Sequence, residues 1–309
     1  MNKKLISLIV PVYFEEECIL QFIKETKAVL DTLSYDYEII FIDDGSKDST
    51  VQLIIEKARL YNWIKLIELS YNQGKQAAVS AGISHANGDY LLYMDPDLQD
   101  PPMEIPNFLT EIEKGYDLVF GIRKEKKDSL INIFLSKIFW GTIDKFTDLQ
   151  LPKGLAVMRI FNRRFANKFL EYQEQNRFVE GIFMHIGMNR SIIEITQRER
   201  FAGTSKFNFK RKMKLAFDAI LDFSELPLKI AVRVGASIST IGFIGLFVII
   251  FLKVILIDFQ AGWPSLISIL IAGFGIQLFF IGIVALYIGK IYKESKRRPL
   301  FSIKTITNL

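Results

Sequence analysis

Cysteine is almost absent from this chain of 309 residues, which contains Cys18 and no other cysteine. A single cysteine cannot form an internal disulfide, so no covalent cross-link within the chain holds the fold together. This cysteine usage fits a reducing compartment and gives no support for secretion.

Two glycine-rich phosphate-binding patterns are also missing. No G-x-x-x-x-G-K-[ST] sequence occurs, which disfavours a P-loop ATPase, and no G-x-G-x-x-G follows the first apolar run, which disfavours a nicotinamide site. Gly74 and Lys75 do open a predicted helix, and the electropositive start of a helix is suited to hold a phosphate group.

A signal peptide is not expected, although the chain begins with two lysines and an apolar run. The run is interrupted by Pro11, three glutamates follow it, and no small-residue cleavage site is present. We therefore expect a buried first strand.

Apolar runs of strand length alternate with helical patterns up to about Arg123. The predicted strands are 5–12, 38–42, 64–69, 90–94 and 118–120, and the predicted helices are 16–33, 49–61, 75–84 and 103–114. Such alternation is typical of a parallel sheet covered on both faces, with sites at the carboxyl ends of its strands. We expect an α/β domain, followed over 124–205 by mixed α+β structure.

The hydrophobic fraction of 50% and the mean hydropathy of +0.22 are high for a purely soluble protein. Two apolar runs, 234–252 and 265–288, each reach the roughly 20 residues that a helix needs to cross a bilayer. Lysine and arginine gather before the first run and after the second, so both ends are expected to face the cytoplasm. We predict a two-helix transmembrane hairpin, with two buried helices of a soluble core as the alternative.

Three oxygen-bearing side chains follow the fourth predicted strand. Asp95, Asp97 and Gln99 are each separated by one residue, and in an extended segment they would point the same way. Two carboxylates and an amide oxygen suit Mg²⁺ or Mn²⁺ with positions left for substrate phosphates. The alternative is an acidic turn formed with the neighbouring prolines. The position after a buried strand favours the metal site.

Asp43 and Asp44 end the second predicted strand, and Ser49 is placed to cap the helix that follows. A carboxylate here can accept a hydrogen bond from a ribose hydroxyl or a base N–H. The alternative is an ordinary strand–turn–helix connection, and this stretch alone leaves both readings open.

The series VPVYFEEE, DDGSKDST, NQGKQAAVSAGI and MDPDLQDPP resembles the family-2 glycosyltransferases, which bind nucleotide sugars on a GT-A fold. More narrowly, GIR at 121–123, RERFAGTSKF at 198–207 and the terminal hairpin resemble the polyisoprenyl-phosphate glycosyltransferases. That group includes dolichyl-phosphate mannose synthase, bactoprenol glucosyltransferases and the aminoarabinose transferase of lipid A modification. The resemblance covers nearly the whole chain, with the motifs in order.

The resemblance implies a role for each motif. It implies that Asp95, Asp97 and Gln99 hold a cation that bridges the donor diphosphate. The residues implied to bind the rest of the nucleotide sugar are Pro11, Tyr13, Glu15, Asp43, Asp44 and Lys75. Those implied to meet the acceptor phosphate or the diphosphate are Arg123, Lys124, Arg200, Ser205 and Lys206. The alternative for the last three is a basic juxtamembrane stretch attracted to anionic lipid headgroups.

One departure from the related pattern concerns an acid. Related transferases often show Asp-Phe-Arg-Leu where this chain has Val157-Met158-Arg159-Ile160, so the acid is absent in that register. Asp148 is the nearby acidic residue and is kept as a catalytic candidate. A phosphate monoester has a second pKa near 6 and is largely ionised at neutral pH, so it needs no strong general base.

The function implied is a metal-dependent, inverting glycosyltransferase that moves one hexosyl or pentosyl unit to a polyprenyl phosphate, such as undecaprenyl phosphate. The product would be a lipid-linked sugar for cell-envelope glycosylation. A UDP-linked donor is preferred, and GDP remains open. One alternative is a processive polysaccharide synthase, although the Q-x-x-R-W pattern is matched poorly by residues 174–178. The other is a non-catalytic membrane protein that binds nucleotide sugars.

The expected organisation follows from these assignments. It comprises a GT-A domain (1–205), interfacial helices (206–229), two spans (230–257 and 264–290) and a basic tail (291–309). We expect a multi-pass protein of the plasma (inner) membrane with the catalytic domain and both termini in the cytoplasm. The expected partners are a nucleotide sugar, the lipid phosphate, the bilayer and a separate flippase for the product, with no nucleic acid. Gly235 and Ser239 form a small-xxx-small pair that permits a homo-oligomer.

Overall fold

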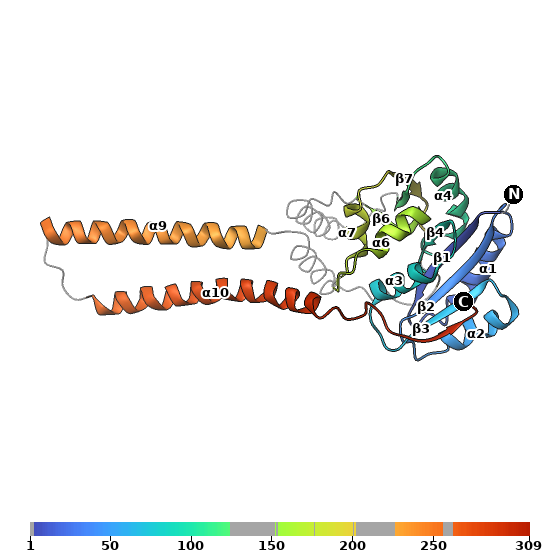
Figure 1. Ribbon diagram of the computed structural model, residues 1–309, viewed down its shortest axis with the longest axis horizontal. Helices are drawn as coiled ribbons and strands as arrows, with labels where there is room; N and C mark the ends of the chain where they lie inside the picture. The colour runs from blue at the N-terminus through green and yellow to red at the C-terminus, as the bar shows by residue number, and fades with distance from the viewer. Residues whose placement is uncertain are drawn as a thin grey trace.

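The computed structural model describes residues 3–123, 152, 154–175, 177–199, 201, 226–255 and 262–309. Figure 1 shows an α/β domain from which two long helices extend side by side, α9 (Leu226–Ile255) and α10 (Trp263–Ser295). Both ends of the chain lie on the α/β domain, because the chain returns to it after α10.

One sheet of eight strands forms the centre of the domain, in the order β7-β5-β6-β4-β1-β2-β3-β8. The strands are β1 (Leu5–Val12), β2 (Asp36–Asp43), β3 (Ile64–Leu69), β4 (Tyr90–Tyr93), β5 (Leu118–Arg123), β6 (Leu155–Asn162), β7 (Arg190–Ile195) and β8 (Ile303–Thr307). The pairs β1–β2, β1–β4, β2–β3 and β5–β7 are parallel, whereas β6 and β8 run antiparallel to their neighbours. The mostly parallel α/β sheet predicted from the sequence is therefore confirmed.

Helices cover both faces of the sheet, because side chains alternate along each strand. In β1, Ile6, Leu8 and Val10 belong to one buried cluster, and Ile9 belongs to the cluster on the opposite face. The helices of the domain are α1 (Ile19–Leu30), α2 (Thr50–Leu60), α3 (Lys75–His85), η1 (Pro102–Glu104), α4 (Ile105–Ile112), α6 (Arg163–Leu170) and α7 (Val179–His185). The first cluster contains residues of α1, α2 and α4, and the second contains residues of α3, α6 and α7.

The helix boundaries follow the hydrophobic pattern closely. α1 buries residues 19, 22, 23, 26 and 30, a spacing that places them on one helical face. One predicted detail is wrong: Ser49 does precede α2, but its side chain makes no capping hydrogen bond. The backbone N–H of Thr50 instead donates to Oδ1 of Asp48 at 3.2 Å.

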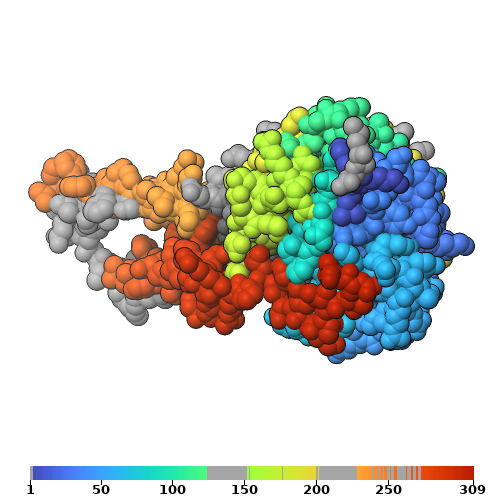
Figure 2. All heavy atoms as spheres, turned by 45° about the vertical axis from the view of Figure 1, so that its right-hand side comes forward, coloured from blue at the N-terminus to red at the C-terminus, as the bar shows by residue number. Residues whose placement is uncertain are grey.

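The segment predicted as a basic tail contains a strand that the sequence reading did not anticipate. β8 pairs antiparallel with β3 and becomes one edge of the sheet. Figure 2 shows this C-terminal segment, in red, packed against the light-blue and teal surface of the domain. Within the sequence IKTIT, Ile303 packs against the second buried cluster, whereas Ile306 is exposed.

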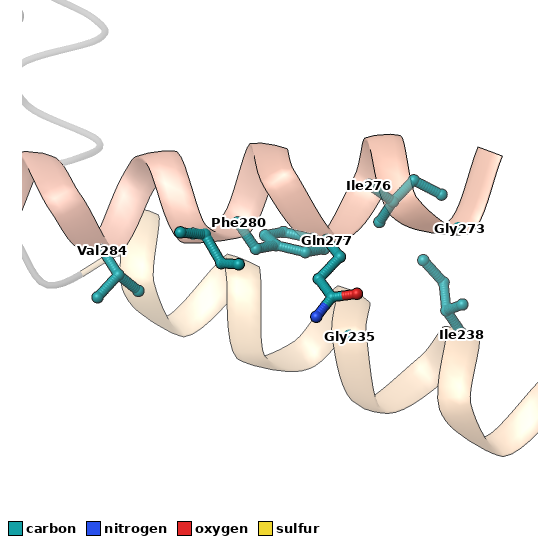
Figure 3. A pocket seen from close by; sticks show the side chains of 8 residues that line it. Gly235, Ile238, Gly273, Ile276, Gln277, Phe280 and Val284 are labelled. Carbon is teal, nitrogen blue, oxygen red and sulfur yellow. The ribbon is translucent and has the colours of Figure 1, made fainter. Parts of the chain in front are cut away.

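The long helices include one stretch suited to a membrane. Among the described residues, Gly273–Ser295 is long and apolar enough to cross a bilayer. A groove between α9 and α10 is lined by residues of both helices, and in Figure 3 Gln277 extends from α10 toward α9 beside Gly235. This stretch overlaps the second predicted span (264–290), and the first predicted span (230–257) stays a prediction.

Candidate functional site

The predicted site residues that the structure describes lie at one end of the sheet, where its parallel strands finish. β1, β2, β3 and β4 are parallel neighbours, so the segments that follow them leave from the same edge. β5 runs antiparallel to β6, which runs antiparallel to β4, so the carboxyl end of β5 reaches that edge as well. The sequence places its acidic and basic motifs at these five ends, and the topology brings them together.

Backbone contacts join the segments after β1 and β2. The N–H of Phe14 donates to Oγ of Ser46 at 3.0 Å, and the N–H of Glu15 donates to Oγ1 of Thr50 at 2.9 Å. Tyr13 is half-buried, and its ring meets that of Phe14 edge-on at 4.5 Å between centroids. Pro11 lies inside β1, beyond the last residue that pairs with β4.

The two aspartates after β2 have different tasks, which the sequence left unresolved. Asp44 accepts hydrogen bonds from the N–H groups of Gln73 (2.6 Å) and Gly74 (2.9 Å), so it shapes the loop after β3. Asp43 accepts from the N–H groups of Gly45 and Ser46 through Oδ2 alone, each at 3.0 Å. Its Oδ1 is buried and has no hydrogen-bond partner in the described part of the chain.

Burial raises the pKa of both carboxyl groups. For Asp43, loss of hydration outweighs the hydrogen bonds from Ser46 and Gly45, which lower the pKa. For Asp44, loss of hydration outweighs the backbone hydrogen bonds from residues 73 and 74. Because a buried acceptor without a donor is costly, Oδ1 of Asp43 indicates a site that a donor group completes.

Lys75 connects the start of α3 with the acidic segment after β4. Its Nζ lies 2.7 Å from Oδ2 of Asp95 and 5.6 Å from the centroid of the Tyr93 ring. Burial opposes the charge of the ammonium, but attraction to Asp95 and Tyr93 outweighs it and raises the pKa of Lys75. The lysine therefore stays protonated at neutral pH and supplies positive charge at this edge.

The premise that residues 95–99 are extended is wrong. The chain turns over residues 96–100, and Leu98 has a φ of 59°. The N–H of Gln99 donates to Oδ1 of Asp97 at 3.1 Å, as in an Asx turn. Strand alternation therefore does not place Gln99 beside the two carboxylates, and its role as a metal ligand stays a prediction.

Asp100 is a site residue that the sequence reading missed. Its carboxylate is 3% exposed and binds Arg123, with Oδ1 lying 3.0 Å from the Nη2 atom of the arginine. Its Oδ2 accepts from the N–H groups of Val157 (2.9 Å) and Met158 (3.1 Å). Asp100 thus holds Arg123 at the end of β5 and fixes the acidic turn against β6. The signal available was its place between the acidic motif and two prolines.

Arg198 and Phe201 lie against the acidic turn. The N–H of Arg198 donates to the carbonyl of Gln99 at 2.9 Å, and that of Phe201 donates to the carbonyl of Asp97 at 3.3 Å. The guanidinium of Arg198 also forms an ion pair with Glu25 of α1 at 3.0 Å. The remaining predicted site residues lie outside the described part of the chain: Lys124, Asp148, Arg200, Ser205 and Lys206.

A cation at this end of the sheet would need ligands from the substrate as well as from the protein. No group of three or more His, Cys, Asp or Glu side chains is placed to hold a metal within the described ranges. Mg²⁺ commonly uses one or two carboxylates together with substrate phosphates and water. Asp95 and Asp97 stay the predicted ligands, and the structure shows Asp95 in an ion pair with Lys75.

Comparison with known proteins places this geometry in a family. The model of glycosyl transferase family 2 matches residues 7–194. The uncharacterised glycosyltransferase YkcC of Bacillus subtilis is 34% identical over 299 residues, which are 96% of this chain and 93% of that protein. The bactoprenol glucosyl transferase of Shigella phage SfV is 35% identical over 302 residues, which are 97% and 98% of the two chains.

A solved structure supports the fold. The crystal structure of glucosyl-3-phosphoglycerate synthase from Mycobacterium tuberculosis, in complex with phosphoglyceric acid, matches with a TM-score of 0.50 and 15% identity. The match covers 72% of this chain and 80% of that one. With the fold, the family model and relatives aligned along nearly their whole length, the chain belongs to glycosyl transferase family 2, as its motifs predicted.

Proposed function

We propose that this glycosyltransferase moves one sugar from a UDP-linked donor to a polyprenyl phosphate at the cytoplasmic face of the plasma (inner) membrane. Relatives named bactoprenol glucosyl transferase, 34–35% identical along nearly the whole chain, support a lipid acceptor. Transfer by a single in-line displacement inverts the anomeric carbon, and the leaving group is the nucleoside diphosphate. The product is a lipid-linked sugar for cell-envelope glycosylation.

The observation that carries the proposal is the buried, unpartnered Oδ1 of Asp43. A base N–H or a ribose hydroxyl of the donor supplies the missing hydrogen bond. Tyr13 and Glu15 follow β1, the strand that pairs with β2, which supports their assignment to the same nucleoside. A nucleotide-sugar site here therefore explains why a buried carboxylate oxygen has no hydrogen-bond donor in the folded chain.

The diphosphate is assigned to the next segments along the edge. Asp95 and Asp97 would hold Mg²⁺ or Mn²⁺, which supplies charge to stabilise the departing diphosphate. When the donor binds, Lys75 can exchange its ion pair with Asp95 for the phosphate oxygens. The backbone N–H groups at the start of α3 would also donate to the diphosphate, because the N-terminus of a helix favours anions.

The acceptor is assigned to the side of Arg123. Its guanidinium is anchored by Asp100 and its side chain is 27% exposed, so it can bind an anion without losing its position. A lipid phosphate is largely ionised at neutral pH and attacks without a strong general base. Lys124, Arg200, Ser205, Lys206 and the catalytic candidate Asp148 remain proposals for this region.

The membrane part follows from the acceptor. The stretch Gly273–Ser295 and the basic residues beside the long helices support attachment to the bilayer that holds the polyprenyl tail. We retain the two-span hairpin as part of the proposal. The proposal also includes a homo-oligomer and a separate flippase for the lipid-linked product.

The decisive variant is Asp97→Asn. The Asn carbonyl can still accept from the N–H of Gln99, so we expect folding to be nearly unchanged. Loss of the carboxylate should weaken binding of the cation that stabilises the departing diphosphate. We therefore expect the rate of transfer to fall at least about 100-fold. The assay combines UDP- and GDP-sugars with undecaprenyl phosphate and Mg²⁺ or Mn²⁺, and reads product mass.

Asp36→Asn is the matched control, because Asp36 is exposed at the opposite end of β2. Full turnover by Asp97→Asn would refute the assignment. Product mass also separates the rivals: a long glycan on the lipid would indicate a processive synthase. Donor binding without lipid-dependent release of nucleoside diphosphate would indicate a non-catalytic binding protein.

A further inference from the structure

The loop 70–74, which joins β3 to α3, is shaped from its inner side by the segment after β2. Asp44 accepts from the N–H groups of Gln73 and Gly74, as described above. Gly45, with a φ of 82°, lies so close that a Cβ there would be 2.9 Å from the backbone nitrogen of Asn72. The loop therefore has little freedom on the side of the proposed nucleotide site.

The outer side of the same loop is held by Ser302, which directly precedes β8. The N–H of Ser302 donates to Oε1 of Gln73 at 2.9 Å, and Nε2 of Gln73 donates to the carbonyl of Ser302 at 3.0 Å. The N–H of Ser70 also donates to that carbonyl at 2.9 Å. The side-chain amide of Gln73 thus pairs with the backbone of a single residue through both its donor and its acceptor.

Ser302 is connected to the membrane part of the chain by a short segment. Glu294 and Arg298, at the end of α10 and just beyond it, bind Gln175 of the α/β domain. The N–H of Gln175 donates to Oε1 of Glu294 at 2.8 Å, and Nε2 of Gln175 donates to the carbonyl of Arg298 at 2.6 Å. The chain from α10 to Ser302 is therefore attached to the domain at both ends, and Figure 2 shows it lying against the domain surface.

We infer that Gln73 is a positioning residue for the donor diphosphate, through which the segment that follows α10 holds the loop 70–74 and the start of α3. The inference rests on the proposed function, because it concerns the same donor site. Gln73 lies next to Gly74 and Lys75, which face the diphosphate in that proposal. A loop held by both Asp44 and Ser302 presents these groups in one arrangement before the donor binds, which reduces the ordering cost of binding.

The test uses the full-length protein and two point variants. Gln73→Ala removes both side-chain hydrogen bonds to Ser302 and leaves the backbone N–H that Asp44 binds. Asn308→Gly is the matched control: it removes two side-chain hydrogen bonds at the other end of β8, to the carbonyls of Ala58 (2.7 Å) and Ile64 (3.1 Å). Glycine is chosen there because Asn308 has a φ of 62°.

We expect Gln73→Ala to raise the Kd for UDP and the KM for UDP-glucose about tenfold, the effect of one to two lost hydrogen bonds. The kcat and the KM for undecaprenyl phosphate should change less than twofold. Gln73→Glu keeps the acceptor for the Ser302 N–H, so its Kd for UDP should lie between those of the wild type and Gln73→Ala. Asn308→Gly should lower the melting temperature as much as Gln73→Ala while the Kd for UDP is unchanged.

The inference is overturned if Gln73→Ala binds UDP as tightly as the wild type, or if both variants weaken UDP binding equally. UDP binding is measured without an acceptor. Failure of lipid transfer alone would therefore refute the proposed function, but the UDP affinities of the variants would still test this inference. A wild type that binds neither UDP nor GDP would overturn both.

Discussion

At the scale of single residues, the site is defined by how each carboxylate is satisfied. Asp44 accepts from the backbone N–H of Gln73, and Asp100 binds the backbone N–H of Met158 and the guanidinium of Arg123. Both carboxylates therefore hold parts of the site in place. Asp43 is only half satisfied, and Asp95 is held by a lysine that substrate can compete for. The aspartates of this region thus divide into those that hold the structure of the site, Asp44 and Asp100, and those proposed to bind substrate or cation, Asp43 and Asp95.

The state of Asp43 predicts an unusual trade between stability and binding. Asp43→Asn keeps an oxygen for the N–H groups of Gly45 and Ser46 and replaces the unpartnered acceptor with an amide group. We expect the Kd for UDP to rise at least about tenfold while the melting temperature does not fall, because a buried carboxylate without a donor is costly. Titration with UDP and thermal unfolding in detergent measure the two quantities.

The raised pKa of Asp43 adds a pH dependence to this prediction. The folded pKa lies above the ordinary value of 3.8, so the stability contributed by the group is present below pH 3.8 and is lost as the pH rises through the folded pKa. The melting temperature of the wild type, relative to Asp43→Asn, should therefore decline from about pH 4 towards neutrality. A difference that stays constant over this range would contradict a raised pKa.

At the scale of elements, α3 is positioned by close packing on β1 and β2. Nearly every residue from Ala77 to Ile83 is buried, and a Cβ on Gly82 would lie 2.6 Å from Cγ2 of Ile9 and 2.7 Å from Cδ1 of Ile42. Gly82→Ala should therefore cost about 1–3 kcal/mol of stability through overpacking. It should also weaken UDP binding, because α3 carries Lys75. Unfolding and UDP titration check both effects.

Gly242→Ala is the control for this prediction. Gly242 lies within α9, and a Cβ there would meet no atom within 4 Å. Alanine is the better helix former, so this change should be neutral or stabilising. If the two variants melt alike, close packing does not set the position of α3.

The elements were predicted better than the site. The bounds of β1 and β3 were predicted as they are observed, because apolar residues dominate both strands. β8 escaped prediction because five residues without apolar alternation carry little local signal, and their pairing with β3 is a tertiary contact. The turn at 96–100 escaped because it depends on Leu98 adopting a positive φ, which leucine rarely does.

The sequence indicated where candidate site residues lie, but it missed those whose roles depend on distant contacts. Asp43 ends β2, Lys75 opens α3, and Asp95 and Asp97 follow β4, so the parallel topology brings these positions to one end of the sheet. The roles of Asp100 and Gln73 arise from partners 57 and 229 positions away along the chain. No local pattern indicates partners so distant.

At the scale of the whole molecule, the catalytic sheet is discontinuous in sequence. Its last strand follows both long helices, so a chain that ends before α9 lacks β8 and exposes the edge of β3. We expect such a truncated chain to aggregate, because unpaired edge strands recruit other chains. A chain in which a flexible linker replaces α9 and α10 but retains residues 296–309 should be monomeric and melt higher.

Size-exclusion chromatography and thermal unfolding of the two chains give the comparison. Both chains contain residues 206–225, so a difference between them reports on the last residues alone. Equal behaviour of the two chains would mean that β8 adds nothing to the stability of the sheet.

The late position of β8 also imposes an order on biosynthesis. At the usual speed of translation, roughly ten to fifty seconds separate the emergence of β3 from that of its edge partner. During that interval both long helices are synthesised while the nascent sheet is one strand short. The loop 70–74 therefore gains its contacts with Ser302 only when synthesis of the chain is nearly complete.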